Sequence, residues 1–430
     1  MTRRFRIGIA GLGTVGAGTL RLLRANADLL AARTGASLAV TAVSARDPGR
    51  DRGVELAGLR WHADARSLAE DPEVDLVCEL IGGSDGPALE LVRRALRLGK
   101  PVVTANKAML AHHGADLARL AETGGVALGY EAAVAGGIPI IKALREGLAA
   151  NRVERVSGIL NGTCNFILTT MRETGREFAD VLAEAQALGY AEADPSFDVD
   201  GVDAAHKLAL LAALAFGGRP RFDAIEIEGI RHVSAIDIAF AEQLGYRIKL
   251  LGTARLTPFG LEQRMGPCMV PAHTPIARVE GVFNGVVVEG DQVGAVLLEG
   301  RGAGGGPTAS AVVADIIDIA RGLRTPTFGV PATALADHPI APISAHEGCF
   351  YIRLMVLDQP GVLADVSAVL RDHDVSIESL IQRGRNPGQA VPIVLTSHDT
   401  TEAAMRGALG QIAALPSVLE PPRLIRIERS

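Results

Sequence analysis

Gly11-Leu12-Gly13-Thr14-Val15-Gly16 is the stretch that decides the fold of the first part of this chain. The apolar run of residues 5–10 precedes it, and residues 17–30 follow with helical spacing. A G-x-G-x-x-G motif between a strand and a helix is typical of a dinucleotide-binding unit. Gly11 permits the tight turn, Gly13 lets the backbone approach a pyrophosphate, and Gly16 allows close packing of helix on strand. Thr14 and Val15 open the helix whose free N–H groups would hold the phosphates. The alternative is a glycine-rich turn that binds nothing.

Outward from this motif, strand-like and helix-like segments alternate. Further strands are predicted at residues 38–44, 74–80, 101–104 and 126–130, with a helix at residues 87–98. Such alternation indicates an α/β fold with a parallel, doubly wound sheet.

The second strand ends in Ser44-Ala45-Arg46-Asp47, where the cofactor type is usually decided. A carboxylate at this strand tip holds the ribose 2′-hydroxyl of NAD, whereas an arginine suits the 2′-phosphate of NADP. Arg46 and Asp47 are adjacent here, so the signal is mixed. We expect NADP, with NAD as the alternative.

Composition narrows the class of protein. The chain has 430 residues, 48% hydrophobic and 21% charged, with 43 basic and 49 acidic side chains and a net charge of −6. This balance argues against nucleic acid or an anionic membrane as the main partner.

The mean hydropathy is +0.23, but no uninterrupted apolar run of membrane length occurs. The start of the sequence does not read as a signal peptide. Four scattered cysteines form no CxxC pair, so we expect a cytoplasmic protein without disulfides or zinc.

Two segments in the middle of the chain place polar groups where a ligand would bind. Thr104 and Lys107 follow a parallel strand, at the edge of the sheet where ligands bind. A lysine at an ordinary helix start is disfavoured by the helix dipole, which weakens a purely structural interpretation. Residues 158–166 run from an apolar strand into Asn161-Gly162-Thr163 and then a helix. This turn offers polar groups to a small substrate, although it could equally be a capped helix start.

A carboxylate-rich segment precedes the most apolar helix of the chain. Asp203 and Lys207 are four residues apart, so they share one face of the helix predicted at residues 203–216. Residues 208–216 are apolar on all sides, which indicates a buried helix. An ion pair at the mouth of a buried helix favours a site over a surface salt bridge. A desolvated lysine can have its pKa lowered and exchange protons, while Glu192 and Asp198 could hold a substrate ammonium group.

The last third reads as a separate module. Residues 308–321 predict a helix, and the proline-rich stretch at residues 325–342 a linker. Beyond it, strands at 349–357, 375–383, 390–397 and 419–427 and helices at 361–372 and 401–414 give the order β-α-β-β-α-β, which is the ferredoxin-like plan.

Taken together, five ordered segments over the first three quarters of the chain resemble homoserine dehydrogenase. They are Gly11 to Gly16, Thr104 to Lys107, Tyr130 to Pro139, Gly158 to Phe166, and Gly189 to Pro195 continued through Asp203 and Lys207. The resemblance implies NAD(P)-dependent interconversion of L-aspartate 4-semialdehyde and L-homoserine, in threonine, methionine and isoleucine biosynthesis. Two alternatives are another amino-acid or oxo-acid dehydrogenase and a non-catalytic, NADP-sensing protein. The paired lysines argue against a sensor, which needs no proton donor.

The resemblance also implies residue roles. Lys207 matches the family's acid–base lysine and Lys107 a second lysine near the nicotinamide. The residues that match substrate-binding positions are Glu192, Asp203, Asp198 and Thr163. Cofactor contacts fall to Gly11, Gly13, Thr14, Val15, Gly16, Arg46, Thr104, Lys107, Gly189 and Gly305. A loop that holds a structural sodium ion, mainly through carbonyl oxygens, matches Glu131, Val134, Gly136 and Ile138.

Two positions depart from the family pattern. Cys164 stands where many relatives carry threonine, a small change that should leave activity intact. Residues 300–308 resemble a family loop that returns to the cofactor, and Arg301 stands where many relatives have proline, so we expect the rigidity of this loop to differ.

The C-terminal module resembles an ACT domain, on Asp358-Gln359-Pro360-Gly361 and on residues 375–382. ACT domains commonly pair and bind amino acids, which implies L-threonine as effector and a homodimer or homotetramer. A dimerisation module without ligand is the alternative. The expected domains are a dinucleotide-binding domain (1–133, completed by about 305–330), a catalytic, substrate and dimerisation domain (134–304), a linker (331–348) and the ACT domain (349–430).

Overall fold

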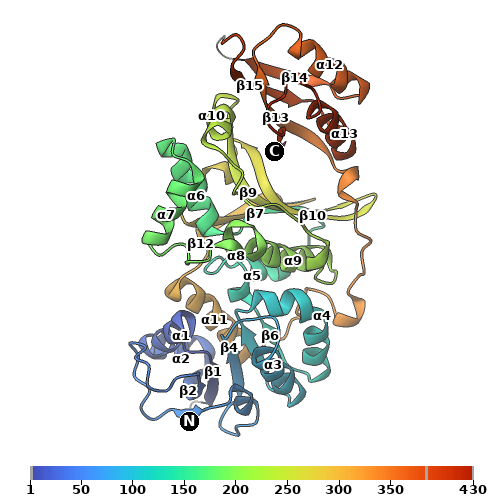
Figure 1. Cartoon of the computed structure of the whole chain (residues 1–430). Helices are drawn as coiled ribbons and strands as arrows, with labels where there is room; N and C mark the ends of the chain where they lie inside the picture. Colours follow the sequence, from blue (N-terminus) through green and yellow to red (C-terminus); the bar gives the residue numbers. More distant parts are fainter. Residues whose placement is uncertain (1–2, 383–385, 429–430) are drawn as a thin grey trace.

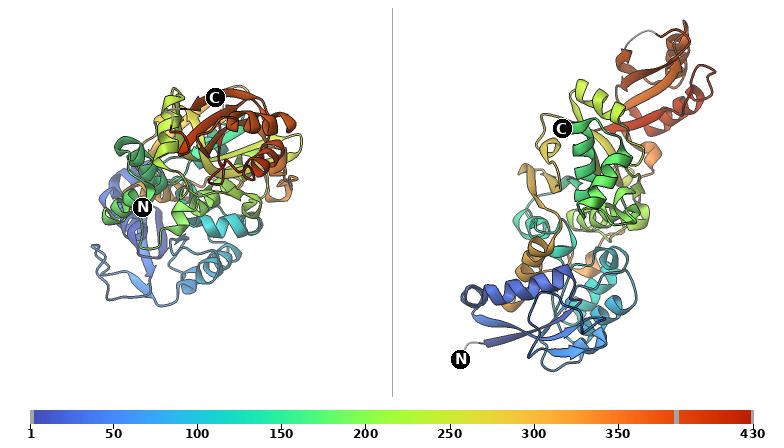
Figure 2. Two further views of the ribbon diagram at one scale, coloured as in Figure 1. Left: turned by 45° about the horizontal axis from the view of Figure 1, so that its top comes forward. Right: turned by 60° about the vertical axis from the view of Figure 1, so that its left-hand side comes forward.

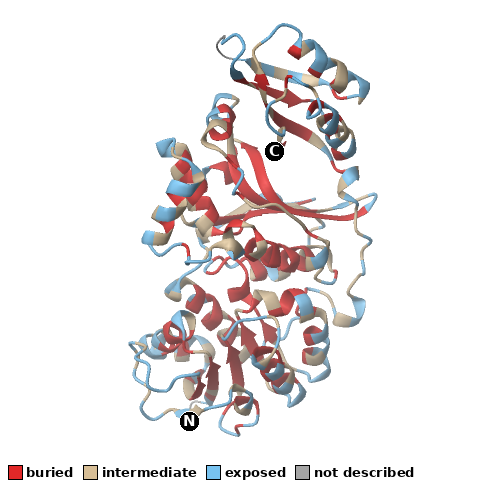
Figure 3. Cartoon of the chain, in the orientation of Figure 1, coloured by how far each residue is buried: buried red, intermediate tan, exposed pale blue. Residues whose placement is uncertain are grey.

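The computed structural model describes residues 3–382 and 386–428, which form three successive parts of an elongated molecule (Figures 1 and 2). The N-terminal part holds a parallel sheet. A large mixed sheet begins in the middle part and continues into the C-terminal part, where two helices pack on it. Buried residues concentrate in the strands and in the helix faces that touch them (Figure 3).

The N-terminal sheet has six strands, all parallel, in the order β3-β2-β1-β4-β5-β6. This order confirms the predicted doubly wound sheet. The strands are β1 (Arg3–Ala10), β2 (Ala36–Ser44), β3 (Arg60–His62), β4 (Leu76–Glu79), β5 (Val102–Thr104) and β6 (Leu128–Gly129). The short edge strand β3 has no counterpart among the predicted strands.

Helices cover both faces of this sheet. One face packs against α1 (Thr14–Ala25), α2 (Ala27–Thr34) and α11 (Gly305–Ala320), and the other against α3 (Pro87–Arg97) and α4 (Lys107–Thr123). The helix predicted at residues 17–30 begins earlier and is two helices separated at Asn26. It begins at Thr14 because Gly13 occupies the N-cap position, so the motif itself forms the first turn.

The middle part is a mostly antiparallel sheet with helices on one face. Its strands are β7 (Val153–Ile159), β8 (Glu226–Ile227), β9 (Tyr246–Thr257), β10 (Gly260–Pro271), β11 (Phe283–Gly290) and β12 (Gly294–Arg301). Its helices are α5 (Ile140–Lys142), α6 (Gly162–Thr174), α7 (Phe178–Ala187), α8 (Ser196–Val199), α9 (Val202–Phe216) and α10 (Ala235–Gln243). The interior of α9 is buried from Asp203 to Leu214, as its apolar sequence predicts.

The C-terminal part has the predicted β-α-β-β-α-β order. Its elements are β13 (Glu347–Leu357), α12 (Val362–Asp372), β14 (Ile377–Gln382), β15 (Ala390–Ser397), the short β16 (Thr400–Thr401), α13 (Glu402–Ile412) and β17 (Arg423–Ile427). The strand predicted at 375–383 ends at Gln382, and Arg383 lies outside the described residues. Strand β17 also pairs with β10, so one eleven-stranded sheet continues from the middle part into this module.

The proline-rich stretch before this module runs along the surface of the middle part (Figure 1). Isolated bridges join Ala336 to Gly218 and Ile340 to Leu261. Hydrogen bonds from Leu261 N to Pro339 O and from Ala341 N to Leu261 O fasten it further, at 2.7 and 3.0 Å. This stretch is therefore extended but held at several points.

None of the helices in the described ranges is long and apolar enough to cross a membrane. All four cysteines lie within those ranges and are buried, and none forms a disulfide.

Candidate active site

The glycine motif forms a cradle at the carboxyl end of β1. Gly11 has φ = +94°, a conformation that glycine adopts without strain. A Cβ atom on Gly16 would lie 2.0 Å from the Gly11 carbonyl oxygen, whereas one on Gly13 would meet nothing within 4 Å. The space beside Gly13 and the N–H groups of Thr14 and Val15 at the start of α1 fit a pyrophosphate.

A second helix start lies beside this cradle. A Cβ on Gly305, the first residue of α11, would lie 3.2 Å from the Thr14 carbonyl oxygen, and one on Gly18 would lie 2.6 Å from the Gly305 carbonyl oxygen. The loop after β12 therefore returns to the motif, although about 290 residues separate the two in sequence. Arg301, at the end of β12, lies with its guanidinium 5.7 Å from the ring centre of Phe283, and its carbonyl oxygen accepts a hydrogen bond from Gly137 N.

The tip of β2 presents Arg46 and Asp47 to solvent. Asp47 Oδ1 accepts a hydrogen bond from Gly49 N at 2.8 Å, so this carboxylate closes its own turn. Arg46 makes no hydrogen bond or ion pair with any residue in the described ranges.

The carboxyl end of β5 is organised by buried polar contacts. Thr104 Oγ1 donates to the buried Glu79 carboxylate at 2.6 Å and accepts from Asn106 N at 3.0 Å. The Asn106 side chain caps α4 by accepting from Met109 N and donates to the Gly83 carbonyl oxygen. These contacts fix the first residue of α4, which is Lys107.

Lys107 and Lys207 converge on one carboxylate. Asp203 Oδ1 lies 3.1 Å from Lys107 Nζ, and Asp203 Oδ2 lies 2.7 Å from Lys207 Nζ. Lys207 Nζ also donates to the Leu160 carbonyl oxygen at 2.7 Å. Lys107 comes from the nucleotide-binding part and the other two from α9, so the cluster lies where α4 and α9 pack together (Figure 1).

The charges in this cluster favour an ionised Asp203. Burial alone would raise the pKa of Asp203, but the ammonium groups of Lys207 and Lys107 outweigh it and hold the pKa well below its ordinary value. The ionised Asp203 carboxylate forms an ion pair with each lysine, one through each oxygen.

Asp198 belongs to the same cluster through Asn161, whose Nδ2 donates to Asp198 Oδ1 at 2.8 Å and to Asp203 Oδ2 at 2.9 Å. Burial and the nearby Asp203 charge raise the pKa of Asp198 above its ordinary value. The segment of residues 189–203 therefore contributes a second, less strongly stabilised carboxylate to the site.

Three other predicted residues lie around this cluster rather than in it. The Thr163 hydroxyl donates to the Tyr190 carbonyl oxygen at 2.8 Å, so its backbone N–H at the start of α6 is the group left toward a ligand. Glu192 is exposed, and its carbonyl oxygen accepts from Gln186 Nε2 at 3.0 Å. Gly189 has φ = +76° in the turn that follows α7. The structure gives the Glu192 carboxylate no contact with the lysine cluster among the described residues.

The loop of residues 131–138 joins the two larger parts of the molecule. Both oxygens of Glu131 accept backbone N–H groups, from Ile141 and Lys142, each at 2.9 Å. Burial and the charge of Asp315 raise the pKa of Glu131 to about 7. Gly136 has φ = +54°, and a Cβ there would lie 2.3 Å from the Gly302 carbonyl oxygen.

Two carbonyl oxygens in this loop accept no hydrogen bond from a described residue, whereas those of Glu131, Ala135 and Ile138 do. Val134 and Gly136 are buried, and their carbonyl oxygens accept no hydrogen bond from any described residue. Buried carbonyl groups are normally paired, so these two fit a hard cation that binds oxygen. The neighbouring Ile138 carbonyl oxygen accepts from Ile140 N at 2.8 Å.

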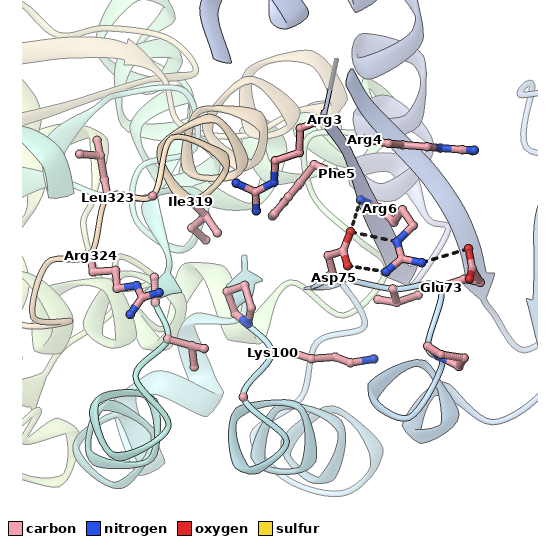
Figure 4. Close-up of a pocket in the computed structure, with 17 residues that line it drawn as sticks. Arg3, Arg4, Phe5, Arg6, Glu73, Asp75, Lys100, Ile319, Leu323 and Arg324 are labelled. Atoms are coloured by element: carbon pink, nitrogen blue, oxygen red, sulfur yellow. Dashed lines mark hydrogen bonds and ion pairs between the residues drawn. The ribbon is translucent and has the colours of Figure 1, made fainter. Parts of the chain in front are cut away.

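A separate cavity of about 870 Å³ lies at the opposite edge of the parallel sheet (Figure 4). It is lined by the start of β1 and by residues that precede β5, which are the amino ends of the strands. Arg6 there pairs with Asp75 at 2.7 Å and Glu73 at 3.1 Å. Ligands of such sheets bind outside the carboxyl ends, so this cavity is not the cofactor site.

Sequence patterns assigned no role of their own to Glu79, Asn106 and Asn161, although Asn161 lies in the polar turn that they did single out. Asn106 and Asn161 each directly precede a helix, where asparagine is a preferred cap. That position was the available signal for both. No pattern in the sequence pointed to Glu79, because a single carboxylate at the end of a buried strand forms no repeating spacing with its neighbours.

Three family models match most of the chain. Residues 11–131 match the model described as "Homoserine dehydrogenase, NAD binding domain", residues 139–317 the model described as "Homoserine dehydrogenase", and residues 350–417 the ACT domain model. A homoserine dehydrogenase of Pseudomonas aeruginosa is 48% identical over 99% of both chains.

Two solved structures extend the comparison. The crystal structure of a homoserine dehydrogenase from Thiobacillus denitrificans has a TM-score of 0.94 and 46% identity, covering 99% of this chain and 98% of that one. A hyperthermophilic archaeal homoserine dehydrogenase in complex with NADPH has a TM-score of 0.63 and 28% identity, covering 75% of this chain and 99% of that one.

Proposed function

This chain belongs to the homoserine dehydrogenase family, and from this premise we propose which of its residues carry the reaction, which cofactor it prefers and how it is regulated. As a family member it is an oxidoreductase that interconverts L-aspartate 4-semialdehyde and L-homoserine with a nicotinamide cofactor. The single observation that carries the proposal is the Asp203 carboxylate held between Lys107 and Lys207.

The bound nicotinamide supplies or accepts the hydride at the substrate carbon. The cradle residues Gly11, Gly13, Thr14, Val15 and Gly16 would hold the cofactor. The other proposed cofactor contacts are Gly305 beside the cradle, Thr104 and Lys107 after β5, and Gly189 after α7. The open space at Gly13 and the approach of Gly305 to Thr14 support this assignment.

The cofactor is NADP in preference to NAD. Arg46 is unpartnered among the described residues and exposed at the tip of β2, whereas the Asp47 carboxylate is engaged by Gly49 N. An arginine free to reach a 2′-phosphate favours NADP. The NADPH complex of the archaeal relative is consistent with this preference.

The substrate's two charged groups would be held by opposite charges. Its α-ammonium group lies toward Asp198, Asp203 and Glu192, and its α-carboxylate toward the free N–H groups of Gly162 and Thr163 at the start of α6. Glu192 is exposed, so this role requires its loop to close over the bound substrate.

Lys207 is the acid–base residue. When the aldehyde is reduced, hydride adds to carbon and the Lys207 ammonium group donates the proton to oxygen, and in the reverse direction the neutral amine takes that proton back. Asp203 and the Leu160 carbonyl oxygen fix Nζ at 2.7 Å each, which orients the N–H that remains for the substrate. Lys107 polarises the same oxygen from the nucleotide-binding side.

A sodium ion binds the loop of residues 131–138. Glu131, Val134, Gly136 and Ile138 would supply carbonyl oxygens, and the unpaired carbonyls of Val134 and Gly136 support this. Titration of sodium into potassium buffer should raise the apparent Tm. Equal Tm values in both salts would count against the site.

The ACT domain would bind L-threonine, and the chain would assemble as a homodimer or homotetramer in the cytoplasm. Supporting features are the Asp358-Gln359-Pro360-Gly361 turn before α12 and four buried cysteines without disulfides. Light scattering with and without threonine measures assembly directly.

A spectrophotometric assay with L-homoserine tests the function. Reduced nicotinamide is followed with NADP and NAD in parallel, with and without L-threonine. We expect turnover, faster with NADP and lowered by threonine. Folded protein that binds NADP but leaves homoserine unchanged would contradict the proposed residue roles.

A further inference from the structure

Asn161 uses its side chain for three different contacts at the centre of the site. Its Oδ1 accepts from Cys164 N at 2.8 Å and so caps α6, while its Nδ2 donates to Asp198 and Asp203. The residue is only 5% exposed. One neutral amide therefore joins the end of β7, the start of α6 and two carboxylates from the segment that follows α7.

The orientation of this amide is determined by its neighbours. With Oδ1 on the Cys164 N–H, both N–H groups face carboxylate oxygens. The flipped amide would put a carbonyl oxygen against two carboxylates and an NH₂ group against an N–H, which is unfavourable at every contact.

The hydrogen bond from Asn161 to Asp203 adds to the two ion pairs that Asp203 forms with the lysines. Asp203 Oδ2 receives both Asn161 Nδ2 and Lys207 Nζ, and Oδ1 is left for Lys107 Nζ. Without Asn161, the carboxylate could rotate and both lysines could share its oxygens differently. The Asn161 contact thus specifies which oxygen faces which lysine.

We propose that Asn161 is a positioning residue of the substrate site, which orients Asp203 between the two lysines and holds Asp198 beside it as an ionised carboxylate. The inference rests on the proposed function, because it concerns the same carboxylates that bind the substrate.

The ionisation of Asp198 depends on the Asn161 hydrogen bond more than the ionisation of Asp203 does. The charged groups that face Asp198 are Asp203 and Lys207 on α9 and Lys107 on α4, and Asp198 itself forms no ion pair with a described residue. The Asn161 hydrogen bond favours the ionised form, against burial and the Asp203 charge. Loss of the amide should therefore raise the pKa of Asp198 further.

The variants Asn161→Ser and Asn161→Asp keep the cap on α6 but remove the hydrogen bonds to the carboxylates. Serine and aspartate cap helices about as well as asparagine, but neither can donate to two carboxylates. A hydrogen bond to a charged group is worth a factor of about ten to a hundred. We therefore expect the KM of N161S for L-aspartate 4-semialdehyde to rise about tenfold while its NADPH affinity stays at the wild-type value. Its Tm should fall modestly, because the cap is kept but buried hydrogen bonds to the carboxylates are lost.

The decisive readout is the pH profile of kcat/KM for aldehyde reduction, in which Lys207 must be protonated and the acid limb reports the carboxylates. We expect the acid limb of N161S to move up by about one pH unit, and that of N161D further, because N161D adds a third negative charge. Asp198→Asn should abolish the acid limb. N161S should lower kcat/KM less in the Asp198→Asn enzyme than in the wild type.

An acid limb that stays at the wild-type position in N161S would overturn the inference, as would a lower Tm with no change in profile. If N161S does not fold, Asn161→Thr, which keeps a capping hydroxyl and fills more of the space, gives the same test. The proposed function fails separately, through a wild-type enzyme that does not turn over.

Discussion

Lys107 Nζ lies 3.1 Å from Asp203 Oδ1, although Lys107 begins the helix that follows β5 and Asp203 lies in the first turn of α9. The ion pair therefore joins the nucleotide-binding part to the middle part, at the place where the proposed function has cofactor and substrate meet. The second oxygen of Asp203 contacts Lys207, so one carboxylate fixes a lysine from each side of the site.

Replacement of Asp203 by asparagine should remove most of the activity. The amide cannot neutralise two ammonium groups that are largely shielded from water, and leaving such charges unpaired costs about 3–5 kcal/mol. We therefore expect kcat/KM to fall by roughly a thousandfold. Steady-state assays of homoserine oxidation measure this. Asp200→Asn is the matched control, because Asp200 lies on the same segment but pairs with the exposed Arg231. Equal losses in both variants would contradict the assignment.

Alanine at Gly13 should impair cofactor binding, whereas alanine at Gly16 should impair stability. A Cβ at Gly13 meets no protein atom within 4 Å, so G13A should fold normally but raise the KM for NADPH, because the methyl group occupies the pyrophosphate's space. A Cβ at Gly16 lies 2.0 Å from the Gly11 carbonyl oxygen, so G16A should lower the Tm. Thermal scans with and without NADPH distinguish the two. A destabilised G13A with unchanged NADPH binding would argue against the cradle.

Arg46→Ala should reduce the preference for NADPH over NADH by about tenfold or more, since a charge-assisted hydrogen bond to phosphate is lost. The measurement is kcat/KM with each cofactor. Arg97→Ala, an exposed arginine in the last turn of α3, should leave the ratio unchanged. An R46A enzyme with the wild-type ratio would mean that another residue recognises the 2′-phosphate.

Local patterns in the sequence predicted the elements whose signal is contained in a few neighbouring residues. The glycine motif gave the strand, turn and start of α1, and the four-residue spacing of Asp203 and Lys207 gave a contact of 2.7 Å. The apolar run after Lys207 correctly indicated a buried helix. The ferredoxin-like order of the C-terminal part also follows from alternation along the chain.

Long-range pairings were beyond such patterns. Nothing in the periodicity of residues 305–320 indicates that α11 packs on α1, and only two residue pairs join β17 to β10. Strands β9 to β12 were not predicted individually. Strand β10 is buried along nearly its whole length, so it lacks the alternation by which a strand is identified. Asn161 was assigned no role of its own, since a helix cap and a carboxylate clamp look alike in sequence.

Lys249 should make stability depend on pH. Burial, together with Arg172 and Arg247, lowers the pKa of Lys249 from 10.5 to about 7, and its Nζ donates to the Val279 carbonyl oxygen at 2.6 Å. Between pH 7 and 10 the unfolded chain binds a proton that the folded chain has released, so folding becomes more favourable as pH rises.

The comparison with Lys249→Met isolates this effect. Relative to K249M, the wild type should gain about 1.4 kcal/mol of stability for each pH unit above 7. Apparent Tm values of both proteins at pH 7, 8 and 9 provide the test. Parallel Tm curves would show that Lys249 keeps the same charge on folding.

The most direct test of the account is the turnover of Lys207→Ala, followed at the nicotinamide absorbance with L-homoserine and NADP. Loss of a positioned acid–base group predicts a fall in kcat of about a hundredfold to ten-thousandfold, with NADPH affinity near the wild-type value. Lys100→Ala, at the opposite edge of the parallel sheet, serves as the control and should retain turnover. A K207A enzyme that keeps most of its turnover would contradict the assignment of proton transfer to Lys207.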